Sequence, residues 1–373
     1  MAPKKKPTGI AATLVRIYEE SNYRTAKNID DWRSAITLAE DLISPTYLPL
    51  YNLYREIELD AHITGLIMQR NNRLLGSQFR IVDEQGNEDV EATRLFERSW
   101  FYKFLEFAMD ARWWGHSLVQ LWDVNENGYG TVELVNRNHI VPSKHVLTPR
   151  QQMLVDAIDY RQPEYYDNLI EVGDGKDLGL FNKAAPNFLI KKNALKEWSK
   201  YAQIFGFPLV LGTTMSKSQA DLERMATNLR KMQSAAYAAL QQGEEVKVVE
   251  TSKTDAYKVF QELILTPNNE LSKLFLGQTM TTDNGSSRSQ SEVHERVADS
   301  IADADKRSIA FLVNDELIPR MIKHGFTVLN KRRFEFAAVK DLAGQMELVK
   351  ALMPYKNVDN KYITETFGIP VED

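Results

Sequence analysis

A polar loop that runs directly into a long amphipathic helix is the feature that most constrains this chain. Residues 281–291 contain no large apolar side chain, and Gly277 and Gly285 loosen this part of the chain. From Val293 onward, apolar residues return at steps of three and four, which is the spacing of one helix face. A loop this polar cannot bury itself in a core. It must be solvated, line a cavity or bind a partner.

The composition excludes several classes of site. The chain has 373 residues, enough for more than one core, and no cysteine, so disulfides, thiolate metal sites and cysteine nucleophiles are excluded. A net charge of −5 disfavours a protein that wraps nucleic acid, although DNA could still pass without sticking. No apolar run approaches the ~20 residues that a bilayer span needs, so no membrane partner is expected.

The first half of the chain mixes helical and strand patterns. Residues 1–35 are predicted to form a flexible basic arm, because Lys4, Lys5 and Lys6 lie between two prolines. Residues 36–185 are predicted to form an α+β unit. Its expected elements are one long helix over 51–76, a strand over 79–82, a helix over 90–114 and a hairpin that turns within 123–130.

The second half is mainly helical. Pro186 is expected to open a helix that ends near Phe205, and further helices are expected over 216–242 and 255–276. Pro267 is expected to break the last of these. A short strand is expected over 246–249, and a long helix over about 290–324. The class predicted for the whole chain is therefore α+β and rich in helices.

No motif predicts an enzyme centre. The chain lacks a nucleotide-binding P-loop, a dinucleotide-binding glycine motif and a nucleophile elbow. None of its histidines pairs with another at helical ligand spacing. No catalytic residue, cofactor or metal site is therefore predicted.

One row of carboxylates leaves alternatives open. These residues are spaced by three, four and four, so they share a face of the long helix: Glu292, Glu295, Asp299 and Asp303. The row could hold a divalent metal for phosphodiester cleavage, line a passage that repels DNA, or be a solvated face. The first option defines the alternative function, a metal-dependent nucleic-acid-processing enzyme that uses the carboxylates of helix 290–305.

A row of lysines is equally ambiguous. Lys192, Lys196 and Lys200 follow one another at four-residue steps on a helix face. Like charges at this spacing repel by a few tenths of a kcal/mol per pair. The row is either a solvated face or, if the helix is repeated around a ring, a stack of positive rings facing a channel.

Several segments resemble motifs of the Mu-like bacteriophage portal proteins. One contains Trp198 followed by Phe205, Gly206, Pro208 and Gly212. A second is the loop-plus-helix segment, in which LGQTMTT at 276–282 precedes SEVH at 291–294. Further residues match the N-terminal part of the family: Asp60, Arg70, Gly115, His116, Ser117 and Trp122. The resemblance spans roughly residues 45–325.

This resemblance implies the portal fold, assembled as a ring, usually of twelve copies. The implied regions are a wing at 36–185, stem helices at 186–205 and 256–277, and a clip at 206–255 between them. They continue with a tunnel loop at 278–289, a long kinked helix at 290–323 and a C-terminal wing or reduced crown at 324–373. The tunnel loop would present these residues to the channel: Gln278, Thr279, Thr281, Thr282, Asp283, Asn284, Ser286 and Arg288.

The resemblance also implies the partners and the location. The ring would lie at one capsid vertex, form the channel for packaging and ejection of double-stranded DNA, and connect head to tail. Its partners would be its own copies, the major capsid protein, the large terminase subunit during packaging, and a head-completion or adaptor protein. Assembly would take place in the host bacterial cytoplasm.

Overall fold

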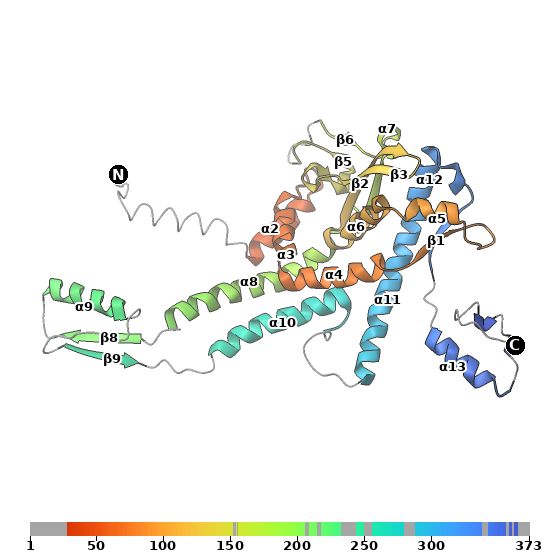
Figure 1. The fold of residues 1–373 in the computed structure, drawn as a ribbon. Helices are drawn as coiled ribbons and strands as arrows, with labels where there is room; N and C mark the ends of the chain where they lie inside the picture. Colours follow the sequence, from red (N-terminus) through yellow and green to blue (C-terminus); the bar gives the residue numbers. More distant parts are fainter. Residues whose placement is uncertain are drawn as a thin grey trace. The chain divides into compact units, whose positions relative to one another are not determined.

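The computed structural model describes residues 28–151, 154, 156–205, 209–214, 218–232, 244–249, 256–279, 288–337, 342–355, 358–359 and 362–364 (Figure 1). The chain divides into two compact units. One contains residues 1–75 and 100–305, and the other contains residues 76–99 and 306–373. Helices and small antiparallel sheets occur together, which confirms the predicted α+β, helix-rich class.

Most of the described residues of the first unit lie in helices. They are α2 (Ile29–Ala39), α3 (Leu48–Glu58), α4 (Ala61–Leu75), α6 (Ser99–Trp114), α7 (Pro163–Tyr166), α8 (Gly179–Phe205), α9 (Gln219–Met232) and α10 (Ala256–Leu276). Helix α11 (Arg288–Leu312) begins in this unit. Two short 3-10 helices are η1 (Arg137–His139) and η2 (Pro142–Lys144).

Among its described residues, the first unit also contains three small antiparallel sheets. In the largest, β2 (His116–Asn125) lies between β3 (Gly128–Leu134) and β7 (Leu169–Gly173). A second sheet has the order β4 (Ile140–Val141), β5 (Val146–Leu147), β6 (Ile158–Asp159). The third pairs β8 (Leu209–Thr214) with β9 (Glu244–Val249), so that Leu209 lies opposite Val249.

Aromatic side chains from four helices form the core of the first unit. Tyr54 of α3 packs against Trp114 of α6 and Phe181 of α8, with ring centroids 5.6 and 5.7 Å apart. Trp113 packs on Phe275 of α10 at 5.6 Å. Helix α6 can supply residues to two sides of this core because its sequence is apolar around most of its circumference.

A turn at Gly115 connects α6 to β2. Gly115 has φ +87°, and a Cβ at this position would lie 2.0 Å from Asp177 O. Only glycine fits such a left-handed position with backbone this close. The turn places His116, the first residue of β2, directly after the buried end of α6.

The second unit contains a two-stranded ribbon and several short helices. Its elements are β1 (Phe79–Val82), α5 (Val90–Phe96), the π-helical turn η3 (Val313–Leu317), α12 (Ile318–Lys323), η4 (Thr327–Leu329), β10 (Arg333–Phe336) and α13 (Leu342–Leu352). Strands β1 and β10 pair antiparallel, with Phe79 opposite Phe336. Phe334 is buried against Phe79 and Phe96, at centroid distances of 5.4 and 6.2 Å.

Two predicted helices in the first half were wrong, and part of the predicted arm is helical. The helix expected over 51–76 is two helices, because the Asp60 carboxylate accepts from the backbone N–H groups of His62 and Ile63 and starts α4 anew. The helix expected over 90–114 is also two, α5 and α6. Part of the arm expected to be flexible is helix α2, which Asn28 and Asp31 begin with a capping box. Residues 1–27 of that arm lie outside the described residues.

The prolines of the second half were also misinterpreted. Helix α8 begins at Gly179, not at Pro186, and continues through Pro186. Helix α10 likewise continues through Pro267. A proline inside a helix costs about 3 kcal/mol. In α8, burial of the surrounding residues offsets this cost: Phe181, Ala184, Ala185, Phe188 and Leu189.

The remaining expected elements lie near their predicted places. The strands of the hairpin extend further than expected, since β2 reaches Asn125 and β3 starts at Gly128. The expected helix over 290–324 is observed as α11, η3 and α12 in succession. Within the described residues, no helix has both the length and the apolar character that a bilayer span requires.

Candidate functional site

Two long helices, α8 and α10, lie side by side and form the candidate functional region (Figure 1). Trp198 of α8 stacks on Phe260 of α10, with ring centroids 6.3 Å apart and planes 3° from parallel. Tyr201 contacts the same ring at 5.6 Å. Strands β8 and β9 and helix α9 come between the two helices in the sequence. These are the segments that were predicted to be stem helices and clip.

Helix α4 is fixed to both long helices by polar contacts. Asp60, at its start, accepts from Lys191 Nζ of α8 at 2.8 Å. His62 Nε2 lies 3.0 Å from both Asn268 O and Ser272 Oγ of α10. The side chains of Asp60 and Lys191 are only about one-tenth exposed. A shielded ion pair of this kind fixes the register between α4 and α8 more strongly than a surface pair would.

The other end of α4 carries a largely buried arginine that joins α10 to α11. Arg70 donates two hydrogen bonds to Asp305 of α11, at 2.7 and 2.9 Å, and a third to Phe275 O near the end of α10. Its guanidinium lies 5.3 Å from the centre of the Trp113 ring. Arg112 adds a second contact to Asp305 at 3.4 Å. The bidentate geometry sets orientation as well as distance.

Gly277 ends helix α10 and lets α11 approach it. Its φ is +72°, and its N–H donates to Lys273 O at 2.9 Å, which closes the helix end. A Cβ on Gly277 would lie 2.9 Å from Val297 Cγ1 and 3.0 Å from Ile301 Cδ1 of α11. The close packing of α11 against the end of α10 therefore depends on glycine.

Only part of the predicted tunnel loop is described. Gln278 is buried, and its side-chain Oε1 has no hydrogen-bond partner among the described residues, while Thr279 is half-buried. Arg288 is the first residue of α11. The remaining predicted members lie outside the described residues: Thr281, Thr282, Asp283, Asn284 and Ser286. Their place in a channel stays a prediction.

The predicted lysine row lies on α8, and two of its members have acidic partners. Lys192 Nζ lies 2.8 Å from Glu56 Oε2 of α3, and Lys200 Nζ lies 2.7 Å from Glu197 Oε1 one turn away. Lys196 is exposed. The positive field of this row is therefore weaker than three free lysines would produce.

The predicted carboxylate row lies along α11. Glu295, Asp299 and Asp303 are exposed, and Asp299 accepts from Arg73 of α4 at 2.6 Å. Glu292 also belongs to α11, but its side chain is outside the described set. Among the residues that the structure describes, no three His, Asp or Glu side chains come together in a way that could hold a metal ion. The described part of the row thus offers no metal centre.

A buried polar cluster that the sequence did not reveal lies at the second small sheet. Glu171 Oε1 lies 3.1 Å from His116 Nε2 and from His145 Nδ1, and it accepts from the Tyr160 hydroxyl at 2.7 Å. Arg161 donates to Glu171 Oε2 at 2.8 Å. One carboxylate therefore joins β2, β7 and the segments around β5 and β6.

The pKa values of His116 and Glu171 in this cluster are shifted from their usual values. Burial lowers the pKa of His116 below its usual value. Burial alone would raise the pKa of Glu171, but hydrogen bonds from His116, Tyr160 and Arg161 outweigh it and lower the pKa to about 2. The sequence shows these residues as isolated side chains on different segments, so no spacing rule could have grouped them.

The comparison with known protein families identifies the chain. Residues 51–369 match the family described as the portal protein of Mu bacteriophage. The chain belongs to this portal protein family. The match covers most of the chain and confirms the resemblance predicted from residues 45–325. No curated protein matches this portal protein.

Solved structures similar to the portal protein are distant in sequence. An HK97 family phage portal protein from Corynebacterium diphtheriae is 15% identical, with 82% of this chain and 97% of that chain covered and a TM-score of 0.41. A chain from the neck of an empty gene transfer agent particle is 10% identical, with coverages of 83% and 90% and a TM-score of 0.49. A chain from the virion of a native gene transfer agent particle is 9% identical, with coverages of 92% and 100% and a TM-score of 0.56. The last match shows the same fold along almost the whole portal chain.

Proposed function

We propose that this portal protein forms a homo-oligomeric ring, of about twelve copies, at one vertex of a phage capsid. Double-stranded DNA passes through the ring without sequence readout, first inward during packaging and later outward during ejection. A terminase motor docks on the ring during packaging, and a head-completion or adaptor protein later replaces it. The major capsid protein surrounds the ring in the virion. Membership of the portal family over residues 51–369 is the observation that carries this proposal.

The net charge and the contacts between the long helices support a channel through which DNA passes passively. The paired helices α8 and α10 are the proposed stem, and the segment between them, residues 206–255, is the proposed clip. The net charge of −5 limits attraction to the phosphates of DNA, which favours sliding over arrest. The buried contacts of Arg70 hold the end of α10 and the body of α11 together, and these are the two helices that flank the proposed tunnel loop.

Electron microscopy of the purified chain tests the proposal. Rings with a central hole are expected, and their rotational symmetry counts the subunits. Monomers alone, at micromolar concentration in several salts and in material extracted from capsids, would refute the ring.

For the channel, Arg288→Glu should leave rings intact and reduce DNA packaging or retention. Packaging and retention equal to wild type would refute the role proposed for the loop.

A metal-dependent nuclease that uses Glu292, Asp299 and Asp303 is the weaker candidate. A two-metal site draws its ligands from several segments, and Asp299 instead faces Arg73 at 2.6 Å. Incubation of pure protein with DNA and magnesium or manganese tests this directly. Cleavage that Asp299→Ala abolishes would favour the nuclease over the passive conduit.

A further inference from the structure

One turn of the first unit presents two apolar side chains to solvent in a fixed conformation. Leu42 and Ile43, between α2 and α3, are 86% and 85% exposed. The Asp41 carboxylate accepts from the backbone N–H groups of Ile43 and Ser44, at 2.8 and 2.7 Å. Lys144 Nζ donates to Leu42 O at 2.8 Å. We call residues 41–44 the apolar knob, because the turn is built to hold both side chains outward.

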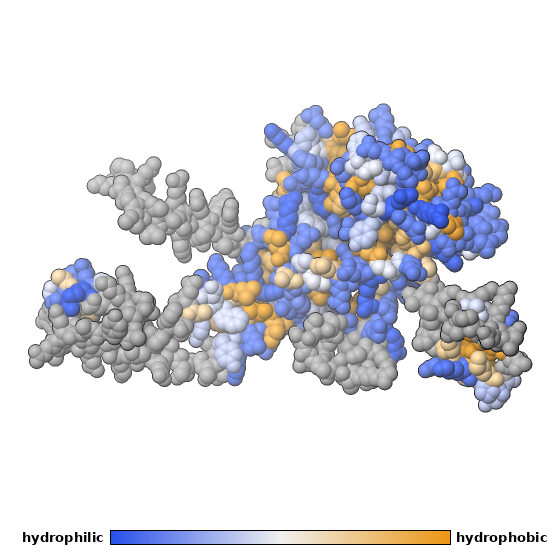
Figure 2. Space-filling view, viewed as in Figure 1, coloured by the Kyte–Doolittle hydropathy of each residue, from blue (hydrophilic) through white to orange (hydrophobic). Residues whose placement is uncertain are grey.

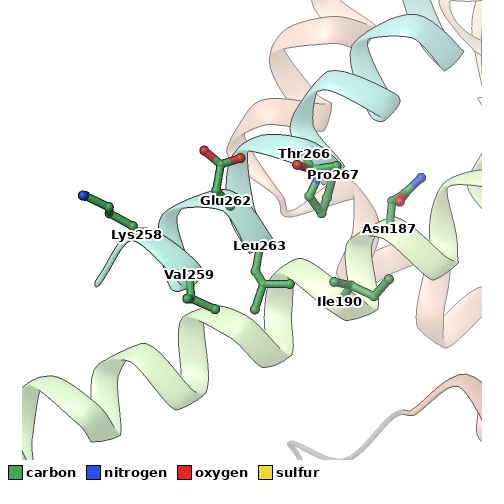
Figure 3. A pocket seen from close by; sticks show the side chains of 8 residues that line it. All are labelled: Asn187, Ile190, Lys258, Val259, Glu262, Leu263, Thr266 and Pro267. Carbon is green, nitrogen blue, oxygen red and sulfur yellow. The ribbon is translucent and has the colours of Figure 1, made fainter. Parts of the chain in front are cut away.

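A groove in the same unit offers an apolar surface without an occupant. It has a volume of ≈540 Å³ and lies between α8 and α10 (Figure 3). Val259 and Leu263 of α10 point toward α8, where Ile190 lies opposite them. These three side chains remain 61%, 41% and 39% exposed, and apolar surface is visible over this part of the molecule (Figure 2). A docked partner could remove these grouped apolar side chains from water.

The knob of one copy does not fill the groove of that copy. Trp32, in the first turn of α2, donates to Asn182 of α8 at 2.8 Å, so the N-terminal end of α2 lies beside α8. The knob follows the opposite end of this helix, whose 11 residues span about 16 Å. The high exposure of Leu42 and Ile43 shows directly that neither side chain is inserted in the groove.

Two different complementary patches on one chain produce a head-to-tail contact between copies, which closes into a ring when the rotation allows it. The charges around the patches also match. Glu40 and Lys144 are exposed beside the knob, and Lys258 and Glu262 line the groove. Each patch therefore carries one acidic and one basic side chain and no net charge, so the contact brings no net repulsion.

We propose that the apolar knob of each copy inserts into the α8–α10 groove of the next copy. This inference rests on the proposed ring and specifies which two surfaces join. Because Leu42 and Ile43 start mostly exposed to water, insertion removes apolar surface from water on both partners. Since the two patches differ, the contact is directional, and it cannot produce a symmetric dimer through the knob alone.

Because the natural chain has no cysteine, any disulfide in a variant must join cysteines that were introduced, so disulfide crosslinking can test the contact. Preformed rings of the double variant Ile43→Cys/Leu263→Cys are oxidised and separated under denaturing, non-reducing conditions. A ladder of covalent multimers reaching the full subunit number is expected. The control is Ile43→Cys with Val124→Cys, a residue of β2 that is 45% exposed and belongs to neither patch.

The outcomes distinguish failure of the proposed contact from failure of the proposed ring. Rings without a ladder, an equal ladder in the control, or covalent dimers from Ile43→Cys alone would overturn the knob-in-groove contact while leaving the ring intact. Absence of rings in the wild-type chain would instead overturn the proposed function itself.

A charge substitution provides an independent measurement. Leu42→Asp/Ile43→Asp should reduce the fraction of chain in rings at least about tenfold, because two carboxylates would enter an apolar groove. The melting temperature of the unassembled chain should not change, since both positions are exposed. Leu59→Asp is the matched control, because Leu59 is 84% exposed and lies outside the knob. Ring formation that survives the knob substitutions, or is lost equally in the control, would contradict the proposal.

Discussion

Removal of the Asp305 charge should destabilise the first unit far more than removal of the Asp299 charge. Both carboxylates belong to α11 and both accept from an arginine of α4. Asp305 and Arg70 are 1% and 12% exposed, whereas Asp299 and Arg73 are 61% and 32% exposed. Breaking a buried pair costs about 3–5 kcal/mol, because the remaining charge is buried without compensation. An exposed pair contributes about 0–1 kcal/mol.

The two distances are nearly equal, which makes the comparison informative. The shortest contact of the exposed pair is 2.6 Å and that of the buried pair is 2.7 Å. If separation alone determined the energy, the two substitutions would have similar effects. Asp305→Asn and Asp299→Asn preserve the side-chain shape and change only the charge, so they isolate the effect of burial.

Tryptophan fluorescence during urea unfolding measures the difference. All six tryptophans lie within residues 1–75 or 100–305, so the signal reports on the first unit. The expected losses in unfolding free energy are about 3–5 kcal/mol for Asp305→Asn and below about 1 kcal/mol for Asp299→Asn, with unchanged slopes. Equal shifts for the two variants, or a loss below about 1 kcal/mol for Asp305→Asn, would refute the reasoning.

Two further predictions concern the Glu171 cluster and the glycines. The pKa of His116 is lowered on folding, so stability should begin to fall as the pH drops below about 6.5. The lowered pKa of Glu171 should add a second loss as the pH falls from about 4.5 toward 2, and Glu171→Gln should remove that second part in a pH series of urea midpoints. Gly65→Ala, in open space on α4, should stabilise by about 1 kcal/mol. Gly277→Ala should destabilise by at least about 1–2 kcal/mol, and thermal melts of the two variants should shift in opposite directions.

The sequence predicted the class of the chain and the long helices because these depend on local periodicity. It did not predict the break between α3 and α4, since the apolar spacing continues across it. The break depends on Asp60, which caps α4 and also pairs with Lys191, a residue 131 positions away. Local pattern cannot distinguish a capping aspartate from one in the middle of a helix when its second partner is this distant.

The candidate site likewise contains residues that the sequence could place and residues that it could not. The resemblance placed the loop and the two long helices, because these motifs are continuous in sequence. The Glu171 cluster and the Arg70 contacts could not be placed, since each gathers side chains from several segments. Pro186 shows the reverse error, because a reliable local rule for helix starts was overridden by burial of Phe181, Ala184 and Phe188.

The pair of Arg70 and Asp305 has two effects that can be measured separately, one on the unfolding free energy and one on the orientation of the helices. Replacement of a buried ion pair by apolar residues of similar size is often neutral or stabilising. Arg70→Met/Asp305→Leu should therefore recover part of the unfolding free energy lost in Asp305→Asn, with about 1–3 kcal/mol still lost because Phe275 O loses its donor. The double variant also loses the paired hydrogen bonds that orient α11 relative to α10 and α4. We expect it to fold, by fluorescence and urea unfolding, yet to form fewer closed rings by microscopy. Closed rings at wild-type yield would show that the pair contributes only stability, and failure to recover stability would show that the site cannot repack.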